Sequence, residues 1–357
     1  MKATLLLENG MMLEGDAIGA AKENIFHLVC NNSMTGYQEW MTNPVYAGQG
    51  VVTTYPLMGN YGICEGDEES DQPWISALIV RHIAPRGSNF RCAGTLDDYL
   101  KKHDIPGICG IDTRALTRIL RNQGTMNAML IFAESFSVQE ALEAIRTTQE
   151  QPLALVKQVT TSVQKHIPGD GKKVAILDFG IANSVLAAFK ERNCDITVFP
   201  ATTAAEIILQ GGFDGVFLSA GPGSPLSCTS ILPEIRSLYK SDLPMFGMGL
   251  GHQLIALSAG MQVSKLPYGH RGSSHPVRNT ETGRIIITAQ NHGYTVERDS
   301  IKPEVAEISH VHVNDGTVEG LRYQRANLRS VQYVPEMHAV SYGDENEYDW
   351  FLSTMQK

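Results

Sequence analysis

The stretch Gly247-Met248-Gly249-Leu250-Gly251-His252-Gln253 lies between an apolar run that predicts a strand, Met245–Gly247, and a pattern that predicts a helix, Gln253–Ala259. A strand, a tight turn and a helix, with glycines two residues on each side of the centre, are typical of a nucleophile elbow. The centre ordinarily holds a serine or a cysteine, whose thiolate the helix dipole would favour. Here the centre is Gly249, which has no side chain. Alone, the heptapeptide is equally compatible with a plain glycine-rich turn. It fits a dinucleotide fingerprint poorly, since the third glycine would fall on His252.

The elbow lies within an alternation of strand and helix patterns that begins after Lys172. Three earlier apolar runs predict buried strands, each followed by a helical pattern: Val174–Leu177, Asp195–Phe199 and Gly215–Ser219. Strands that alternate with helices predict a parallel sheet with right-handed crossovers. Further strands are expected at Ile285–Ala289 and Arg329–Tyr333.

The first 150 residues have no such rhythm. Apolar runs predict strands at Ala3–Leu7, Gly50–Thr54, Ser76–Val80 and Met126–Ile131. Helices are expected from about Asp97 to Lys102, Ala115 to Arg121 and Val138 to Gln149. This half therefore predicts a mixed α/β domain over residues 1–150. Residues 151–171, which include much of the polar stretch Lys165–Lys172, are expected to be a linker to a second domain over 172–357.

Composition narrows the class of protein. The 357 residues suit two domains of roughly 150 residues each. A net charge of -9 gives no electrostatic reason to bind nucleic acid or an anionic membrane. No signal-peptide pattern opens the chain, and no apolar stretch approaches the roughly 18 residues that span a bilayer. Six scattered cysteines without CxxC spacing predict reduced thiols, as in the cytoplasm, and argue against a zinc site built on them.

Two other glycine-bearing clusters accompany the elbow. Ser219–Pro225 follows the third strand, and its backbone N–H groups could hold a developing oxyanion, although a lone Gly-Pro-Gly is more often a simple turn. Ala289–Tyr294 is the other cluster. His310 and His312 could share one face of a strand as a metal pair, but no third ligand is evident nearby. We therefore expect no metal in this chain.

Together these clusters resemble, in order and spacing, the class I (triad) glutamine amidotransferase domain, specifically that of the carbamoyl-phosphate synthetase small subunit. The first half carries motifs peculiar to that subunit: Ser33–Glu39, Tyr55-Pro56 with Gly59-Asn60, Ser88–Arg91, and Ile111–Arg114 with Leu116–Arg118. The second half matches at Asp178–Gly180, Gly221–Gly223, Leu250–Gln253, His275–Val277 and Gln290–Gly293. The resemblance covers nearly the whole chain. It implies a mixed α/β N-terminal domain followed by an amidotransferase-like α/β domain, with a mainly parallel sheet flanked by helices.

The sequence departs from this family at the catalytic positions. The family elbow reads G-x-C-x-G-H-Q, so Gly249 occupies the nucleophile position. The second catalytic motif, Q-G-H-P-E, reads Gln-Tyr-Val-Pro-Glu here, which puts Val334 at the general-base position and retains only the orienting carboxylate, Glu336. His338 is wrongly spaced to replace the base. Since nucleophile, base and orienter act as a unit, Glu336 alone orients nothing.

By resemblance, the substrate glutamine would be held by Ser33, Gly221, Gly223, Leu250, Gln253, Asn291, Gly293 and Tyr294. After Asp178–Gly180, the basic and amide residues usual in the family are replaced by Ala182, Asn183 and Ser184, which puts the contacts of that helix in doubt. Ala182, Ser274 and Tyr333 also depart from the family pattern. These departures argue against an engineered replacement of the two catalytic residues alone and suggest relaxed selection.

The resemblance also implies a partner. Family members pass ammonia from glutamine to a large subunit that makes carbamoyl phosphate from bicarbonate and ATP, for pyrimidine and arginine synthesis. This chain has no G-x-x-x-x-G-K-[ST] loop, so ATP and magnesium are expected only on the large subunit. We expect a glutaminase-deficient subunit that supports an ammonia-using partner. Two alternatives stay open: a glutaminase with a displaced thiol, Cys228 or Cys64, and a glutamine-binding pseudoenzyme without a synthetase partner.

Overall fold

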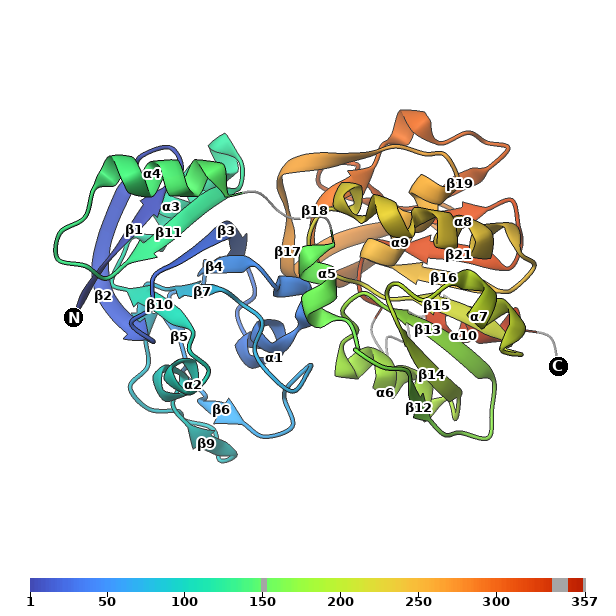
Figure 1. Ribbon diagram of the computed structural model, residues 1–357, viewed down its shortest axis with the longest axis horizontal. Coiled ribbons are helices and arrows are strands. Elements are labelled where there is room, and N and C mark those ends of the chain that lie inside the picture. The colour runs from blue at the N-terminus through green and yellow to red at the C-terminus, as the bar shows by residue number, and fades with distance from the viewer. Residues whose placement is uncertain (149–152, 336–345, 356–357) are drawn as a thin grey trace. The chain divides into compact units, whose positions relative to one another are not determined.

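The computed structural model describes residues 1–148, 153–335 and 346–355. The chain divides into two compact units, Met1–Glu150 and Gln151–Lys357, each with its own core (Figure 1). Among the described residues, no helix is both long enough and apolar enough to cross a membrane.

The first unit is built on a closed barrel of seven strands. Around the barrel they run in the order β1 (Lys2–Leu7), β11 (Met126–Ile131), β3 (Asn24–Asn31), β4 (Gln49–Thr53), β7 (Ala77–Ile79), β10 (Pro106–Cys109), β2 (Met12–Gly19). Closure leaves the barrel without free strand edges. Two short pairs lie outside it: β5 (Leu57–Met58) with β8 (His82–Ile83), and β6 (Ile63–Cys64) with β9 (Cys92–Gly94).

Side-chain caps set the starts of three helices in this unit. Thr95, Asp112 and Ser137 each accept a hydrogen bond from the backbone N–H three residues on, which satisfies a donor that the helix leaves free. The helices of the unit are α1 (Tyr37–Thr42), the 3-10 turn η1 (Pro44–Tyr46), α2 (Leu96–Lys102), α3 (Thr113–Gln123) and α4 (Val138–Thr147).

A ten-stranded sheet organises the second unit. Its order is β12 (Lys165–Ile167), β14 (Asp195–Pro200), β13 (Lys173–Asp178), β15 (Gly215–Leu218), β16 (Met245–Met248), β21 (Leu328–Val331), β20 (Val318–Tyr323), β19 (Ala306–His312), β17 (Val263–Asn279), β18 (Ile285–Val296). The five strands from β14 to β21 pair in parallel, which confirms the expected parallel core. The pairings beyond them are antiparallel, an extension that the strand–helix rhythm did not predict.

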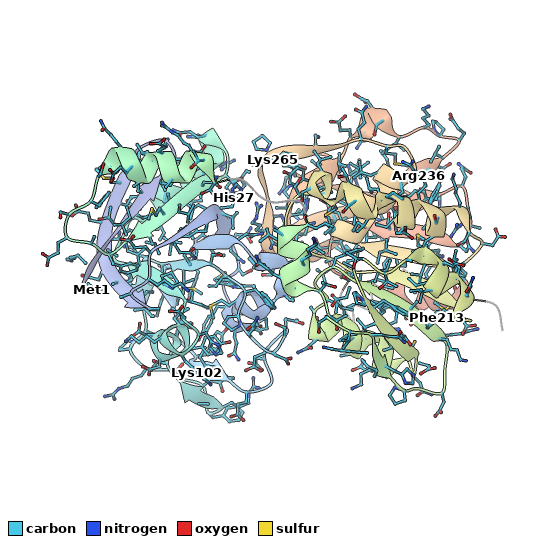
Figure 2. The ribbon with its side chains drawn as sticks, in the orientation of Figure 1. Met1, His27, Lys102, Phe213, Arg236 and Lys265 are labelled. Carbon is cyan, nitrogen blue, oxygen red and sulfur yellow. The ribbon has the colours of Figure 1, made fainter. Side chains whose placement is uncertain are left out.

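Helices flank this sheet: α5 (Ala154–Val159), α6 (Asn183–Glu191), α7 (Ala205–Gln210), η2 (Pro225–Ile231), α8 (Leu232–Lys240), α9 (Leu250–Ser258), η3 (Arg298–Ser300) and α10 (Glu347–Ser353). The ring of Phe189 on α6 packs edge-on against Phe217 of β15 and Tyr348 of α10, with centroid separations of 5.1 and 5.3 Å. Phe213, labelled in Figure 2, packs against Phe199 at 5.6 Å. Aromatic packing thus contributes to holding helices and loops on the sheet.

The expected linker needs correction. Residues 151–171 contain helix α5 and strand β12, and β12 adds to the sheet by pairing antiparallel with β14. Thr161 N–H and Thr160 Oγ1 also bond to Asp178 at the end of β13. Polar, turn-rich composition suggested a linker, but these cross-strand bonds make the segment part of the second unit.

Candidate functional site

The backbone of the predicted elbow is present. Gly249 joins β16 to α9 with φ 56° and ψ −113°, and its N–H donates to Val331 O at 2.9 Å. A positive φ of this kind is rare for residues with a side chain and is typical of strained functional turns. The turn therefore has the shape that presents a nucleophile, at a position that carries no reactive atom.

The flanking glycines are required by close packing. A Cβ on Gly251 would lie 2.3 Å from Leu218 O, and one on Gly247 would lie 2.4 Å from Ile255 Cδ1. Gly251 N–H also donates to Ser219 O at 3.1 Å, so the first turn of α9 rests against the end of β15. The spacing of glycines in the sequence thus reflects the packing of α9 on its sheet.

The glycine turn after β15 lies against the elbow. Ala220 Cβ stands 2.9 Å from the place where a Cβ on Gly249 would be, and a Cβ on Gly221 would meet Leu250 Cδ2 at 2.9 Å. Ser219 Oγ fixes this turn, because it accepts from Phe179 N–H and donates to Ala220 O, both at 2.8 Å. Gly223, with φ 85°, completes the turn. The structure therefore brings Gly221 and Leu250 of the expected pocket together.

The segment expected to hold the general base lies beside β18. Val334 N–H donates to Ala289 O at 3.1 Å in an isolated bridge, and its side chain has no ionisable group. Tyr333, 2% exposed, packs edge-on against His310 with ring centroids 5.6 Å apart. Glu336 and His338 lie outside the described residues, so the orienting role of Glu336 stays a prediction.

Gln253 connects three elements of the expected pocket. Its Nε2 donates to Tyr294 O on β18 at 3.0 Å and to Gln332 Oε1, just after β21, at 2.8 Å. Gly293 packs near Arg271, since a Cβ there would lie 3.0 Å from Nη2. Asn291, one strand position from the buried Gln290 and His292, points to the other face of β18. These contacts place Gln253 and Tyr294 together, while a role for either in binding glutamine stays a prediction.

Ser33 belongs to the first unit, where its N–H donates to Asn31 Oδ1 at 2.7 Å, just beyond β3. Its expected approach to Gly249 concerns two separate units and stays a prediction. Asp178 is held within the second unit by N–H groups of Thr161, Gly180 and Ile181 at 2.7–2.8 Å, although burial raises the pKa of its carboxyl. Helix α6 starts after Ala182, which offers no side-chain cap.

His252, Cys228 and Cys64 are poorly suited to act as a general base or a nucleophile. His252 is fully buried, its Nδ1 lies 2.7 Å from Ser330 Oγ, and burial lowers its pKa to about 3. Cys228 is 1% exposed within the apolar core. Cys64, in the other unit, is fully buried, and burial raises the pKa of its thiol. A buried thiol in apolar surroundings is inert, because burial disfavours the thiolate.

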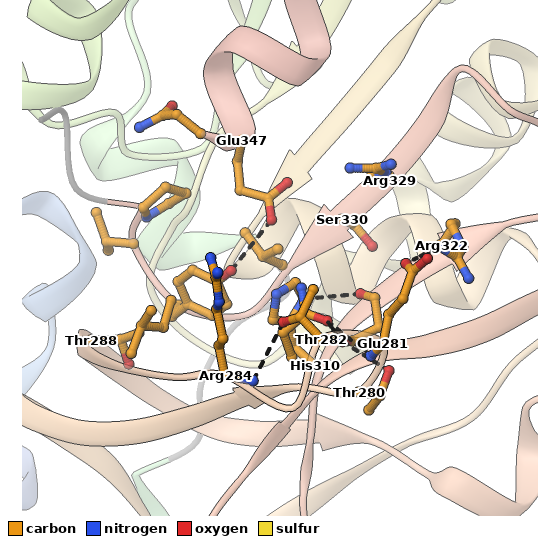
Figure 3. Close-up of a pocket in the computed structure, with 18 of the residues that line it drawn as sticks. Thr280, Glu281, Thr282, Arg284, Thr288, His310, Arg322, Arg329, Ser330 and Glu347 are labelled. Carbon is orange, nitrogen blue, oxygen red and sulfur yellow. Dashed lines mark hydrogen bonds and ion pairs between the residues drawn. The ribbon is translucent and has the colours of Figure 1, made fainter. Parts of the chain in front are cut away.

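A cavity of about 340 Å³ lies beside the segment that was expected to hold the general base (Figure 3). It is lined by Val334 and Tyr333, by residues 279–282, and by arginines that already have partners. Arg322 pairs with Glu281 and Glu307, and the guanidinium of Arg329 stacks 4.2 Å from the Trp350 ring. None of the eight residues expected to hold glutamine lines this cavity, so it is separate from the expected pocket.

A buried polar cluster on β17, β18 and β20 was not predicted from the sequence. It contains His270, Gln290, His292 and Glu319, and the pair His275 and His312 lies beside it. His310 and His312 do not act as a pair: with register shifts around His310 on β19, His310 packs against Tyr333, whereas His312 Nε2 lies 3.2 Å from His275 Nδ1. The available signal was Gln290 and His292, which share one strand face.

Two family models match this chain, one in each unit. The model of the carbamoyl-phosphate synthase small chain, CPSase domain, matches residues 5–130, and the model of class-I glutamine amidotransferases matches residues 175–354. Among solved structures, a putative GMP synthase protein from Thermoplasma acidophilum aligns with a TM-score of 0.42 and 18% identity, over 51% of this chain and 90% of its own.

Similar curated proteins extend over nearly the full length. The carbamoyl phosphate synthase small chain of Listeria monocytogenes serotype 4b is 44% identical over 354 residues, covering 99% of this chain and 97% of that protein. The pyrimidine-specific small chain of Bacillus subtilis is 41% identical over 356 residues, covering 100% and 96%. On the strength of both matches, which run through the barrel unit and the amidotransferase-like unit alike, this chain belongs to the carbamoyl-phosphate synthase small chain family.

Proposed function

We propose that this chain is a small subunit that binds a large carbamoyl-phosphate synthase chain but does not hydrolyse glutamine. The complex of the two chains would make carbamoyl phosphate from bicarbonate, ATP and free ammonia. ATP and magnesium would be bound by the large chain. The small chain would act as a structural and regulatory partner in pyrimidine or arginine synthesis.

One observation carries this proposal: the elbow retains its backbone geometry around a residue without a side chain. Gly249 has the positive φ of a nucleophile elbow, and Gly247 and Gly251 pack as closely as the turn demands. Amide hydrolysis through a covalent intermediate needs a nucleophile and a base that takes its proton and returns it to the leaving ammonia. Neither Gly249 nor Val334 offers such a group.

The displaced-thiol alternative is less well supported. Cys228 lies within the apolar core and Cys64 is fully buried with a raised thiol pKa. A replacement thiol would also need a base and an oxyanion hole within about 3 Å of the reacting atom. The remaining alternative, a glutamine-binding pseudoenzyme without a synthase partner, keeps the expected pocket and differs only in what it binds.

The test combines co-purification with a comparison of nitrogen donors. The full chain is co-expressed with a large synthase chain, and carbamoyl phosphate is measured with ammonia or with glutamine. We expect a stable complex that is active with ammonia and inactive above background with glutamine. Equal activity with both donors would overturn the proposal, and glutamate release that Cys228→Ala abolishes would establish the displaced thiol.

Binding of glutamine is measured separately by calorimetry on the isolated chain. If the predicted pocket is retained, Ser33→Ala and Gln253→Ala should both weaken binding, whereas Ser227→Ala, a matched hydroxyl outside the predicted pocket, should not. Glutamine binding without any association with a large synthase chain would favour the pseudoenzyme alternative.

A further inference from the structure

Four buried polar side chains converge from three strands of the second unit. His270 comes from β17, Gln290 and His292 come from β18, and Glu319 comes from β20. Their exposed fractions are 7%, 4%, 8% and 0% respectively. Burial of a carboxylate and two imidazoles is costly unless their lone pairs and protons are matched.

The distances within this cluster match the face of a metal coordination tetrahedron. His270 Nδ1 lies 3.2 Å from His292 Nε2 and 3.3 Å from Glu319 Oε1, and the last two atoms are 3.7 Å apart. With zinc–ligand bonds of about 2.0–2.1 Å, neighbouring ligand atoms of a tetrahedral site stand about 3.3–3.4 Å apart. Gln290 Oε1, 2.8 Å from His292 Nε2, is near enough to be a fourth ligand.

The hydrogen-bond partners around His292 leave acceptors facing one another. Its Nδ1 lies 2.8 Å from Tyr294 O, a carbonyl that can only accept, so this nitrogen carries the proton. The amide of Gln290 is fixed, because its Nε2 donates to Glu319 Oε2 and Thr288 Oγ1, both at 3.0 Å. Its oxygen therefore faces the unprotonated Nε2 of His292. A neutral imidazole donates from one nitrogen only, so a cation between these atoms would resolve the conflict.

The outer contacts of both histidines are those of metal ligands. His270 Nε2 lies 2.8 Å from Asp315 Oδ2, and His292 Nδ1 faces a backbone carbonyl. Metal-binding histidines usually donate their second N–H to a carboxylate or a carbonyl, which orients the ring and points the other lone pair at the ion.

We propose that His270 Nδ1, His292 Nε2 and Glu319 Oε1 bind one divalent metal ion, with Gln290 Oε1 as the fourth ligand. Nitrogen and oxygen donors at these separations suit zinc(II). This inference replaces our expectation that the chain holds no metal, and it does not depend on the proposed function.

The neighbouring pair, His275 and His312, is a separate candidate for a metal site, because with His270 it forms a second group of close ligand atoms and His275 Nε2 is buried without a hydrogen-bond partner among the described residues. His312 Nδ1 lies 3.3 Å from both Asn314 N and Asp315 Oδ1, and His312 Nε2 lies 3.2 Å from His275 Nδ1. The rings of His270 and His312 are stacked, with centroids 4.0 Å apart and an interplanar angle of 17°, which does not aim their nitrogens at one centre. His275 therefore provides a matched control inside the same region.

An ion at this site would stabilise the strand that carries the expected pocket. Tyr294 O accepts from both His292 Nδ1 and Gln253 Nε2, so a fixed His292 also fixes the carbonyl that holds Gln253. Asn291 and Gly293 lie between these anchors on β18. The role we assign to the ion is structural: it ties β17, β18 and β20 together.

The experiment uses the full chain, stripped with a chelator and titrated with zinc(II) by calorimetry and with cobalt(II) by visible spectroscopy. We expect one tight equivalent, cobalt bands of a tetrahedral site, and a thermal midpoint that rises with zinc. Glu319→Gln, which keeps the shape and removes the charge, should abolish the tight site. Asp315→Asn, which acts through His270, should weaken it roughly 10–100-fold, and His275→Gln should leave it unchanged.

Three outcomes would overturn the proposal. Wild-type protein that binds zinc no better than Glu319→Gln would show only adventitious binding at the surface. Loss of the site in His275→Gln would place the ion at the other histidines. Zinc X-ray absorption on the wild type that shows fewer than two imidazole ligands would also contradict it, and this measurement requires no variant to fold.

Discussion

The elbow around Gly249 and the buried polar cluster of His270, Gln290, His292 and Glu319 lie in the same unit but differ as chemical sites. The elbow has the backbone of a reactive centre without the reactive groups. The cluster has closely spaced titratable groups, deep in the unit, that are not members of the predicted triad. The fold constrains the backbone at the elbow, whereas it constrains the side chains in the cluster.

The packing of the elbow requires its flanking glycines and requires no side chain at position 249. A nucleophile or a general base contributes mainly to the reaction, whereas Gly247 and Gly251 are required by the packing of α9 and cannot change cheaply. The members of the cluster depend on one another, since removing one partner leaves a buried polar group unsatisfied. The packing of the elbow therefore does not depend on a reactive side chain at its centre.

The largest expected effect would come from restoring the reactive groups. Gly249→Cys/Val334→His/Tyr333→Gly should hydrolyse glutamine, whereas the wild type and Gly249→Cys alone should not, because losing either member of such a unit costs on the order of 10⁴ to 10⁶ in rate. Glutamate release measures the difference. Tyr333→Gly removes a buried ring at a cost of about 3–5 kcal/mol, so circular dichroism must show that the triple variant folds.

Two results would break this comparison between scaffold and reactive groups. A triple variant that folds and binds glutamine but stays inactive would mean that the scaffold has drifted further than its motifs indicate. Full activity of Gly249→Cys alone would show that Val334 is not the lost base, and His338 would become the candidate.

A smaller effect is expected from overpacking the elbow. In Gly251→Ala the new methyl would lie 2.3 Å from Leu218 O, a backbone atom that cannot easily move. We expect a loss of about 3 kcal/mol in the free energy of unfolding, measured by urea denaturation. Gly94→Ala is the control: no atom lies within 4 Å of its added Cβ, so the change should stay within about 0.5 kcal/mol. Equal losses in both variants would refute the packing argument.

The next prediction concerns pH. Burial lowers the pKa of His252 to about 3, against 6.5 for the exposed group. Because the unfolded chain binds this proton first, the stability is present above pH 6.5 and declines as the pH falls below it. Between pH 7 and pH 5, His252 should account for a loss of about 2 kcal/mol. His252→Asn should flatten this slope, and a slope unchanged from the wild type would contradict the assignment.

The smallest effect tests whether the elbow has adapted to glycine. Gly249→Ala introduces a side chain at φ 56° and places its Cβ 2.9 Å from Ala220 Cβ. We expect it to destabilise the chain by about 1–2 kcal/mol. Ala220→Gly should relieve part of this loss, so a double-mutant cycle should give a coupling of roughly 0.5–1 kcal/mol. Strict additivity would show that the two residues do not compete for space.

The sequence alone determined the local features of this protein. Apolar runs separated by helical patterns predicted the parallel strands around β13, β15 and β16, because hydrophobic periodicity is a property of consecutive residues. The spacing of Gly247 and Gly251 located the elbow for the same reason. The sequence also showed that Gly249 and Val334 lack reactive groups.

Only the tertiary structure decided which distant residues meet. His270 lies 22 residues from His292 and 49 from Glu319, and register shifts in β17 and β19 affect which side chains turn inward. The same limit hid the docking of β12 on β14, which composition had suggested was part of a linker. Cross-strand register depends on bulges and on pairing between distant segments, so a one-residue slip changes every neighbour, and no local pattern reports it.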